Sequence, residues 1–527
     1  MAANHVIDVD LANVYEQPNK KGFLRTMAWG DRVEVLKVTS EHVEVRVFRF
    51  EKQEDGTSKP IPSSGFIVPP KSSGTKPKDV VREKRESRVL MVNFVDVQQG
   101  DGAVLETPKG KIVLIDGGEN VMFARYLASR FRSTHAGRPK EIDCIVVSHG
   151  DADHFKGLTE IYKSEQNKTT FQRLFIHPQR VYHNGLVKRP SKNRKEAEML
   201  GATKVVKDPS TGKDVTIITG LETDILKVPD EEMNEPFLEW KEALKEWKKR
   251  GPIEFRRLEV GDNDAFDFLA DEGVRVEVLG PLPTRVKNVE GLKFLGSPPR
   301  GPRVGHESLE TEIQGFTGKS ASHTINGHSI VLRVTYGRVN FLFSGDLNDE
   351  SGRALTAAHN RGEINLQAEV FKVPHHGSAD FSGAFLQAVA PVVSVVSSGD
   401  DNARVEYIHP RATLVGALGR YSRLEEPLIF VTELVAFFSY EGLVRPEFHK
   451  LGADDICVIK DNVAQLNAKA RKQFIAFSRA AFGIVKVRTD GQRLFVYTNS
   501  GQSDLKEAYA YEVDDRGAVK PALVRVA

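Results

Sequence analysis

The chain has 527 residues, of which 40% are apolar and 28% are charged, and its net charge is +2 when histidine is neutral. These proportions are typical of a globular protein with a large core. They exclude a mainly disordered chain, a coiled coil, a collagen and a disulfide scaffold. The near-zero charge argues against a uniformly basic nucleic-acid coat but permits local basic patches.

Cysteines and long apolar segments are both scarce. Cys144 and Cys457 are the only cysteines, so the chain has no CxxC zinc motif and no disulfide framework. The longest apolar run, residues 428–438, contains Thr and Glu and is shorter than the roughly 20 residues that span a bilayer. The N-terminus lacks the basic and apolar regions of a signal peptide. We therefore expect a soluble, cytoplasmic protein without membrane association.

Residues 1–70 alternate apolar and polar side chains in short runs separated by Gly, Pro and Asn, a pattern typical of strands. The turn at Gly30 and Asp31 before a Val-rich run resembles a small SH3-like barrel of the bacterial type, and a plain β appendage is the alternative interpretation. We expect this domain to bind a protein partner or to pack on the core rather than to catalyse. Residues 71–88 have the Pro, Lys, Ser and Gly composition of a linker.

After the linker, three apolar strands precede a helix at residues 121–132 and an apolar strand at residues 142–150. The last strand is apolar throughout, which indicates cover on both faces of a sheet. This order implies a sheet packed against helices. Strand character returns at 329–346, 368–373 and 391–398, and the last 70 residues indicate a helix at 464–481 followed by two or three strands.

A basic segment interrupts the strands. Residues 168–213 hold eleven Lys or Arg against three acids. Such a run is usually a solvated face, but beside a metal site it could hold phosphates. An amphipathic helix is expected at 237–250, and residues 281–323, rich in Gly and Pro, are expected to form a long loop.

Carboxylates and imidazoles gather where predicted strands end. They come from the motifs IDGG, SHGDADH, SGD, HHGS and IHP, and they are Asp116, His149, Asp151, Asp153, His154, Asp346, His375, His376 and His409. Strand ends followed by turns present side chains to a cleft, and these residue types are the ligands that Zn²⁺ or Mn²⁺ accepts. The sequence therefore predicts a metal site, although a single SHGDADH loop could also be a surface turn.

The spacing in H-x-D-x-D-H suits two metals, because in an extended loop His149, Asp151 and Asp153 could project one way and His154 the other. A later carboxylate such as Asp346 could bridge both ions. Two metals about 3.5–4 Å apart would hold a bridging hydroxide and stabilise the attacking and leaving oxygens.

The order of these motifs resembles the metallo-β-lactamase fold hydrolases, most closely the hydrolase domain of the bacterial competence DNA-uptake channel protein. The run FVDVQQGDG before the first motif, and FLFSGD, FKVPHHGS and IHP after it, carry the same resemblance. It implies an α/β fold with a four-layer αββα sandwich over residues 89–450, interrupted by the basic insertion around 165–320. Residues 451–527 would form a C-terminal α+β extension.

The resemblance also implies roles for the residues. His149 and Asp151 match ligands of a first metal, Asp153 and His154 match ligands of a second, and Asp346 matches the bridging carboxylate. His375 or His376 matches a late ligand, His409 is a candidate for another ligand or a phosphate contact, and Asp116 matches a buried acid that orients the site. Asp153, which would also orient the attacking water, is expected to carry the reaction with His154 and His376. The cofactors would be two divalent ions, Zn²⁺ or Mn²⁺.

The chain departs from the superfamily pattern in three ways. Asp151 stands where a His is usual, which makes the site harder and favours Mn²⁺ relative to Zn²⁺. The usual third-motif His is not evident. His177, His323 and His328 are candidates, of which His177 and His328 are more typical of structural or surface positions, and one metal could lack a protein ligand. The competence channel has membrane spans that this sequence lacks, so channel function is not implied. Asp96, Gln99 and Asp101 are expected to shape their loop and support the site rather than bind metal.

Three functions fit these motifs. The first is a metal-dependent phosphodiesterase, a nuclease that cleaves DNA, suggested by the resemblance and the basic insertion. The second is a hydrolase of a small substrate such as a lactone, a thioester or a cyclic nucleotide, using the same site. The third is a metal-stabilised interaction scaffold without catalysis, against which the complete ligand set argues.

Overall fold

The structure is a computed structural model that describes residues 4–52, 58–296, 318–399, 409–433, 458–460, 463–465, 483–499 and 507–527. The helix expected at 464–481 lies outside these residues except for its first two positions. Within the described parts of the chain, no helix combines the length and apolar character needed to cross a membrane.

The N-terminal segment folds into a seven-stranded sheet in the order β3-β2-β6-β5-β4-β1-β7. Its strands are β1 (His5–Ile7), β2 (Leu11–Tyr15), β3 (Phe23–Ala28), β4 (Arg32–Val38), β5 (Val43–Lys52), β6 (Ser58–Ile67) and β7 (Val81–Glu83). Every second residue of β2 is buried, as the alternating pattern predicts. β7 lies in the segment that resembled a linker, and it pairs with β1, so part of that segment belongs to the sheet.

A ten-stranded sheet follows, in the order β17-β14-β12-β10-β9-β8-β28-β29-β30-β31. Its strands from the middle of the chain are β8 (Leu90–Phe94), β9 (Gly102–Glu106), β10 (Ile112–Asp116), β12 (Cys144–Val147), β14 (Arg180–His183) and β17 (Glu254–Arg257). Its C-terminal strands are β28 (Ile484–Thr489), β29 (Arg493–Asn499), β30 (Ala508–Val513) and β31 (Val519–Ala522). Because β28 pairs antiparallel with β8, the C-terminal strands continue the sheet.

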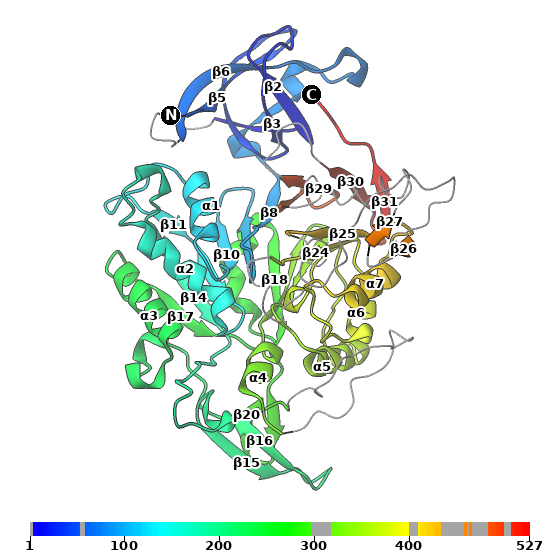
Figure 1. The fold of residues 1–527 in the computed structure, drawn as a ribbon. Helices are drawn as coiled ribbons and strands as arrows, with labels where there is room; N and C mark the ends of the chain where they lie inside the picture. The colour runs from blue at the N-terminus through cyan, green and yellow to red at the C-terminus, as the bar shows by residue number, and fades with distance from the viewer. Residues whose placement is uncertain are drawn as a thin grey trace.

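A six-stranded sheet in the order β18-β21-β22-β23-β24-β25 packs against the ten-stranded sheet (Figure 1). It contains β18 (Val274–Gly280), β21 (Val331–Tyr336), β22 (Val339–Phe343), β23 (Val370–Lys372), β24 (Val393–Val396) and β25 (Leu428–Val431). One buried cluster joins the two sheets, including Val92 and Leu105 from one and Phe341 and Val393 from the other. The main hydrophobic core therefore lies between the sheets.

Helices cover the outer faces of both sheets (Figure 1). The ten-stranded sheet carries α1 (Met122–Arg130), α2 (Ala152–Ser164) and α3 (Glu235–Lys248), and the six-stranded sheet carries α5 (Asp349–Asn360), α6 (Gly383–Val389) and α7 (Ala412–Tyr421). The apolar faces of these helices are buried, as in α3, where Trp240 and Trp247 pack edge to face as core residues. The layers follow the order helix, sheet, sheet, helix.

The insertion forms a small sheet of its own, β15-β16-β20-β19, which extends from the end of the molecule opposite the N-terminal sheet (Figure 1). Its strands are β15 (Thr203–Lys207), β16 (Asp214–Ile218), β19 (Thr284–Val286) and β20 (Val289–Lys293), and α4 (Ala321–Gly327) follows. The expectation of an uninterrupted loop over 281–323 is wrong for its first part, because β20 pairs antiparallel with β16. The register joins Ile218 to Leu292, which are 74 positions apart in the sequence. Two short pairs complete the strands: β11 (Lys140–Ile142) with β13 (Ile176–Pro178), and β26 (Val458–Lys460) with β27 (Val463–Gln465).

The two chain ends are fastened together. Val526 bridges to Leu11, and the fully buried Asp10 accepts hydrogen bonds from the guanidinium groups of Arg493 and Arg525. Arg488, also fully buried, donates to the carbonyl oxygen of Trp29 at 3.1 Å. The buried pair of Asp10 and Arg493 thus helps to hold the N-terminal sheet on the C-terminal strands, because separating such a pair is costly.

Candidate metal centre

The predicted site residues converge because they follow the carboxyl ends of neighbouring parallel strands. β10 pairs parallel with β12 in one sheet, and β22 pairs parallel with β23 in the other. Asp116 ends β10, the SHGDADH loop follows β12, Asp346 follows β22, and the two histidines of HHGS follow β23. The carboxyl ends of parallel strands share one edge of a sheet, so the two sheets bring four separate motifs to one place.

Asp346 lies at the centre of the cluster. Its carboxylate is 3.2 Å from His154 Nε2 and 3.1 Å from His376 Nε2, and Nε2 of both His149 and His375 is 4.0 Å from it. His376 Nε2 is also 3.3 Å from an oxygen of Asp153. In the part of the chain that the structure describes, Asp101, His154, Asp346 and His376 form a buried group whose potential ligand atoms all lie within 4.8 Å of one another.

Each of the two central imidazoles has a carboxylate behind it. Asp116 Oδ2 accepts a hydrogen bond from His154 Nδ1 at 2.9 Å, and Asp101 Oδ1 lies 3.3 Å from His376 Nδ1. Both arrangements leave Nε2 facing Asp346, which is how a ligating histidine is oriented and made more basic. Asp116 therefore lies where the sequence placed it. Asp101 was expected only to support the site, but it lies directly behind His376 and orients that ring.

Lys372 is a site residue that the sequence did not reveal. Its side chain is buried, forms an ion pair with Asp101 and donates to the carbonyl oxygen of Gly345 at 3.2 Å. The only signal was a lysine within the otherwise apolar VFKV strand, and buried lysines need a partner. That partner is 271 positions away in the chain, so local pattern could not identify it.

The cluster is strongly anionic, and its electrostatics reflect this. Burial favours the neutral form of Asp346, but His376 and His154 outweigh it and hold the pKa of that carboxyl well below its usual range. Burial likewise opposes the charged forms of His154 and His376, yet Asp346 and the acid behind each ring raise both pKa values well above the ordinary one. The carboxylates thus demand positive charge between them, from protons or from a metal.

The buried atoms at the centre fit a divalent cation. His154 Nε2, Asp346 Oδ1 and His376 Nε2 have no hydrogen-bond partner among the described residues, although they face one another. Buried polar atoms are otherwise almost always satisfied. Imidazole nitrogens and carboxylate oxygens are ligands for Zn²⁺ and Mn²⁺. Asp116, His375 and His376 also adopt positive φ angles of 51–58°, backbone strain that is typical of functional sites.

Asp151 has a different environment from the other residues of its motif. Lys188 Nζ, from the insertion, donates to its Oδ1 at 2.7 Å, and the amide of Asn326 lies 2.9 Å from its Oδ2. Burial raises the pKa of Asp151, and Lys188 opposes that rise. The carboxylate that replaces the usual histidine therefore has a protein cation as its partner, and it is not part of the four-residue group.

His149 and the late histidines lie around the same centre. Ser148 Oγ and Ser329 Oγ approach His149 Nδ1 at 3.1 and 3.3 Å, which fixes the ring. Burial, followed by the neighbouring His154, lowers the pKa of His149 well below its usual value. The ring of His409 lies 6.2 Å from that of His375, and burial lowers its pKa to about 3. His409 thus borders the cluster through His375.

The three candidates for a third-motif histidine have other partners. His177 Nδ1 lies 2.9 Å from Glu141, His328 Nε2 lies 2.7 Å from the carbonyl oxygen of Lys293, and His323 Nδ1 lies 3.4 Å from Asp380. In the described residues, none of them belongs to the four-residue group. Their positions match the structural roles that are typical of isolated histidines.

Comparison with known proteins finds a similarity over one segment of the chain. Residues 95–170 match the model of the metallo-beta-lactamase superfamily. Strands β9, β10 and β12, the SHGDADH loop and α2 all lie in this range. Over 86 residues the chain is 42% identical to Competence protein ComA of Neisseria gonorrhoeae, and over 98 residues it is 32% identical to ComE operon protein 3 of Bacillus subtilis (strain 168). These matches cover 16% and 18% of this chain and 12% of each relative.

Solved structures add little. The chain resembles CmlA, a diiron beta-hydroxylase from Streptomyces venezuelae, at 13% identity and a TM-score of 0.28, over 68% of this chain and 54% of that one. A score this low supports no functional argument. The similarity to the metallo-beta-lactamase superfamily therefore depends on the sequence match over residues 95–170.

Proposed function

We propose that this chain is a metal-dependent phosphodiesterase that cleaves DNA. The observation that carries the proposal is the convergence of His154, Asp346 and His376, with His149 and Asp153 beside them, on one buried centre with unsatisfied ligand atoms. The curated relatives named as competence proteins, and the resemblance to the competence hydrolase domain, favour DNA as the substrate. We further propose two divalent ions, Zn²⁺ or Mn²⁺, a cytoplasmic location and an SH3-like barrel that receives a protein partner.

The exposure of the side chains suggests how the work is divided. Divalent cations, when bound, would polarise the phosphodiester and make a water molecule more acidic. The Asp153 side chain is 21% exposed and that of His375 is 22% exposed, whereas that of Asp346 is 4% exposed. Asp153 can therefore accept a proton from the attacking water while Asp346 stays an internal ligand. His375, at the rim, can donate a proton to the leaving oxygen.

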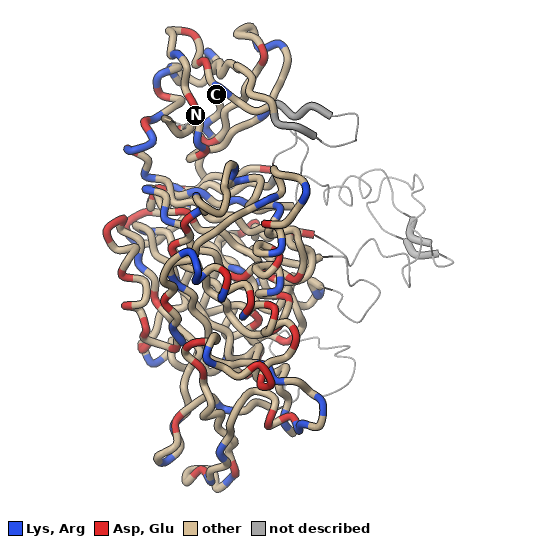
Figure 2. Tube along the Cα trace, turned by 90° about the vertical axis from the view of Figure 1, so that its left-hand side faces the viewer, with Lys and Arg blue, Asp and Glu red and all other residues tan. Residues whose placement is uncertain are grey.

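The cations of the insertion bear on the choice of substrate. Lys188 is paired with Asp151, while Arg189 and Arg194 both pair with Glu232. Figure 2 shows basic and acidic residues interspersed along the chain rather than gathered on one face. Because acidic residues neutralise these cations, a second candidate function is the hydrolysis of a small anionic substrate. The experiment must therefore distinguish this function from DNA cleavage.

The test uses purified full-length protein with Mn²⁺ or Zn²⁺ and labelled plasmid, single-stranded DNA and RNA. We expect wild type to cut DNA and the double variant Asp153→Ala with His154→Ala to be inactive. Lys168→Gln, which removes a charge from the insertion away from the cluster, is the matched control. Equal cleavage by wild type and the double variant, or none with either metal, would reject the proposal. A small substrate, unlike a polymer, would give little dependence of binding on salt.

A further inference from the structure

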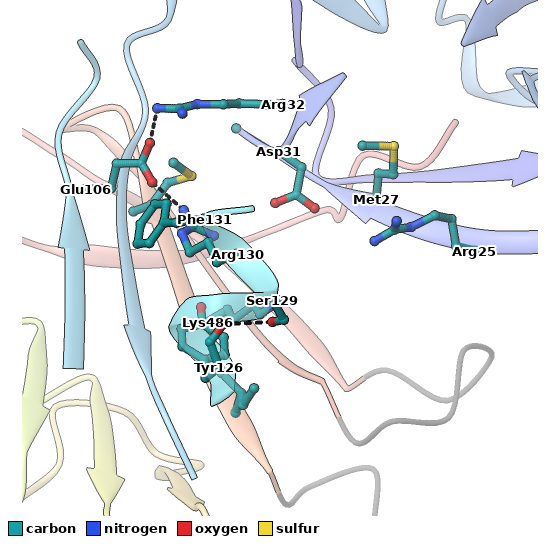
Figure 3. Close-up of a pocket in the computed structure, with 13 residues that line it drawn as sticks. Arg25, Met27, Asp31, Arg32, Glu106, Tyr126, Ser129, Arg130, Phe131 and Lys486 are labelled. Atoms are coloured by element: carbon teal, nitrogen blue, oxygen red, sulfur yellow. Dashed lines mark hydrogen bonds and ion pairs between the residues drawn. The ribbon is translucent and has the colours of Figure 1, made fainter. Parts of the chain in front are cut away.

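A second candidate site lies between the N-terminal sheet and the ten-stranded sheet. It is a pocket of about 390 Å³ lined from both sides, with Arg25, Asp31 and Arg32 on the N-terminal sheet and its turn, and Tyr126 and Arg130 on α1 (Figure 3). Lys486 of β28 completes the wall. The pocket therefore exists only where three segments far apart in the sequence meet.

This pocket is separate from the metal centre. β9 follows directly after Asp101 of the cluster and ends at Glu106, which lines the pocket. Five residues of strand at roughly 3.3 Å each place the two sites about 16 Å apart. None of the lining residues is a predicted metal ligand. A ligand here would not contact the catalytic cluster.

The lining has an excess of positive charge. Four cationic side chains face two acidic ones. Of the acids, Glu106 is already engaged by both Arg32 and Arg130. The other, Asp31, lies 3.7 Å from Arg488, which approaches from β28. Both acids of the lining are therefore already engaged by arginines.

Arg25 is the lining arginine that no acid among the described residues engages. It makes no ion pair with any residue that the structure describes, and its side chain extends from β3 toward α1 (Figure 3). Asp31 is its nearest acidic neighbour in the lining, and that carboxylate is shared with other cations. Positive charges crowd this region, since burial and the nearby Arg25 lower the pKa of Arg132.

Two buried polar groups of the pocket also lack partners. The hydroxyl of Tyr126 and the Nε of Arg130 have no hydrogen-bond partner within the described parts of the chain. Both are donors, and buried donors are nearly always satisfied by protein, water or ligand. Together with the Arg25 guanidinium, they are suited to a group that offers several acceptor oxygens and no protons.

We propose that this pocket binds a small phosphate-bearing ligand of nucleotide size. Guanidinium groups match phosphate oxygens in a fork geometry, and a phosphate would supply the missing negative charge. The volume of about 390 Å³ lies within the range of small-molecule sites, about 300–1,000 Å³. Met27, Met91 and Phe131 form an apolar wall that inorganic phosphate would not use but that suits a sugar and base.

Calorimetry on the full chain tests this directly. AMP and dTMP are titrated in the presence of EDTA, so that no metal can hold a nucleotide in the catalytic cluster, with adenosine and inorganic phosphate as parallel probes. We expect both nucleotides to bind, adenosine not to bind, and phosphate to bind more weakly than the nucleotides. Arg25→Gln should weaken nucleotide binding about tenfold, the effect of losing one charge-assisted hydrogen bond.

Two further variants make the result decisive. Lys37→Gln removes one exposed positive charge from β4 outside the pocket, and it should bind like wild type. Tyr126→Phe keeps the ring but removes the unsatisfied hydroxyl, and it should also weaken binding. Nucleotide binding that is absent at millimolar concentration, that is equal in Arg25→Gln and Lys37→Gln, or that is matched by adenosine would overturn the proposal.

Discussion

Asp116→Asn provides a sharp test of how the metal centre is built. Oδ2 of Asp116 accepts hydrogen bonds from both His154 Nδ1 at 2.9 Å and Ser148 Oγ at 2.6 Å, and Oδ1 accepts from Ser148 N at 2.7 Å. An amide has only one acceptor oxygen, so either the two side-chain donors or the backbone donor must lose its partner. The change conserves volume, and its effect is therefore electrostatic rather than steric.

The expected size follows from these contacts. A buried donor left without its acceptor costs about 1–3 kcal/mol in the free energy of unfolding of the metal-free protein. Removing the acid behind a ligating histidine typically lowers metal affinity by about 10- to 100-fold, which corresponds to about 1.4–2.8 kcal/mol of binding free energy. We therefore expect Asp116→Asn to fold, to be moderately less stable and to bind Mn²⁺ or Zn²⁺ at least tenfold more weakly.

Metal affinity is measured by competition with a chelator, and folding is checked by circular dichroism. Asp143→Asn is the matched control, because Asp143 Oδ2 accepts a backbone hydrogen bond from Ile112 at 2.7 Å at the opposite end of β10. Unchanged metal affinity in folded Asp116→Asn would refute the orienting role. An equal loss in both variants would show that damage to the sheet, rather than the orientation of His154, weakens metal binding.

Three other results are expected. Gly100→Ala should reduce metal-dependent activity at least tenfold, because a Cβ there would meet the backbone oxygen of Asp153 at 1.8 Å and only a backbone shift relieves such overlap. The control Gly212→Ala, also at positive φ but in open space, should keep its activity. Equal activity of the two variants would contradict this prediction. Asp10→Ala should lower the unfolding free energy by about 3–5 kcal/mol, since it leaves the buried Arg493 without its carboxylate. An unchanged midpoint of urea denaturation would show that this ion pair does not stabilise the fold. Burial lowers the pKa of His183 from 6.5 to about 4, so its neutral ring stabilises the fold above pH 6.5 and this contribution is lost as the pH falls toward 4. The free energy of unfolding of His183→Gln should therefore decrease less steeply over that interval than that of wild type. Parallel pH profiles of the two proteins would disprove this prediction.

The match between sequence and structure is closest where chemistry and local pattern coincide. The motif SHGDADH follows an all-apolar strand, and that order alone places His149 at a strand end. His154 lies in the first turn of α2, which begins at Ala152. The alternation in β2 and the apolar face of α3 could also be predicted from the sequence, because each pattern reflects the burial of one side of a regular element. Side chains that bind metal are also few in kind, so their clustering in a motif is informative by itself.

The partners of these residues depended on the tertiary fold. Lys188 reaches Asp151 from an insertion that looked like a generic basic segment, and Lys372 reaches Asp101 across the two sheets. β28–β31 extend the sheet begun by β8, although nearly 400 residues separate β8 from β28. An ion pair or a strand pairing of this kind is a property of two distant positions, and neither position carries a local signal for the other.

The sequence by itself determined which motifs could supply metal ligands, because ligand chemistry restricts them to imidazoles and carboxylates. It did not include Asp101 among those ligands. Only the tertiary structure decided which members face a common centre and which are neutralised by lysine, since that depends on which strands lie side by side. The pocket between the N-terminal sheet and α1 has the same origin: Arg25, Arg130 and Lys486 are unremarkable in sequence, and their shared cavity follows from packing.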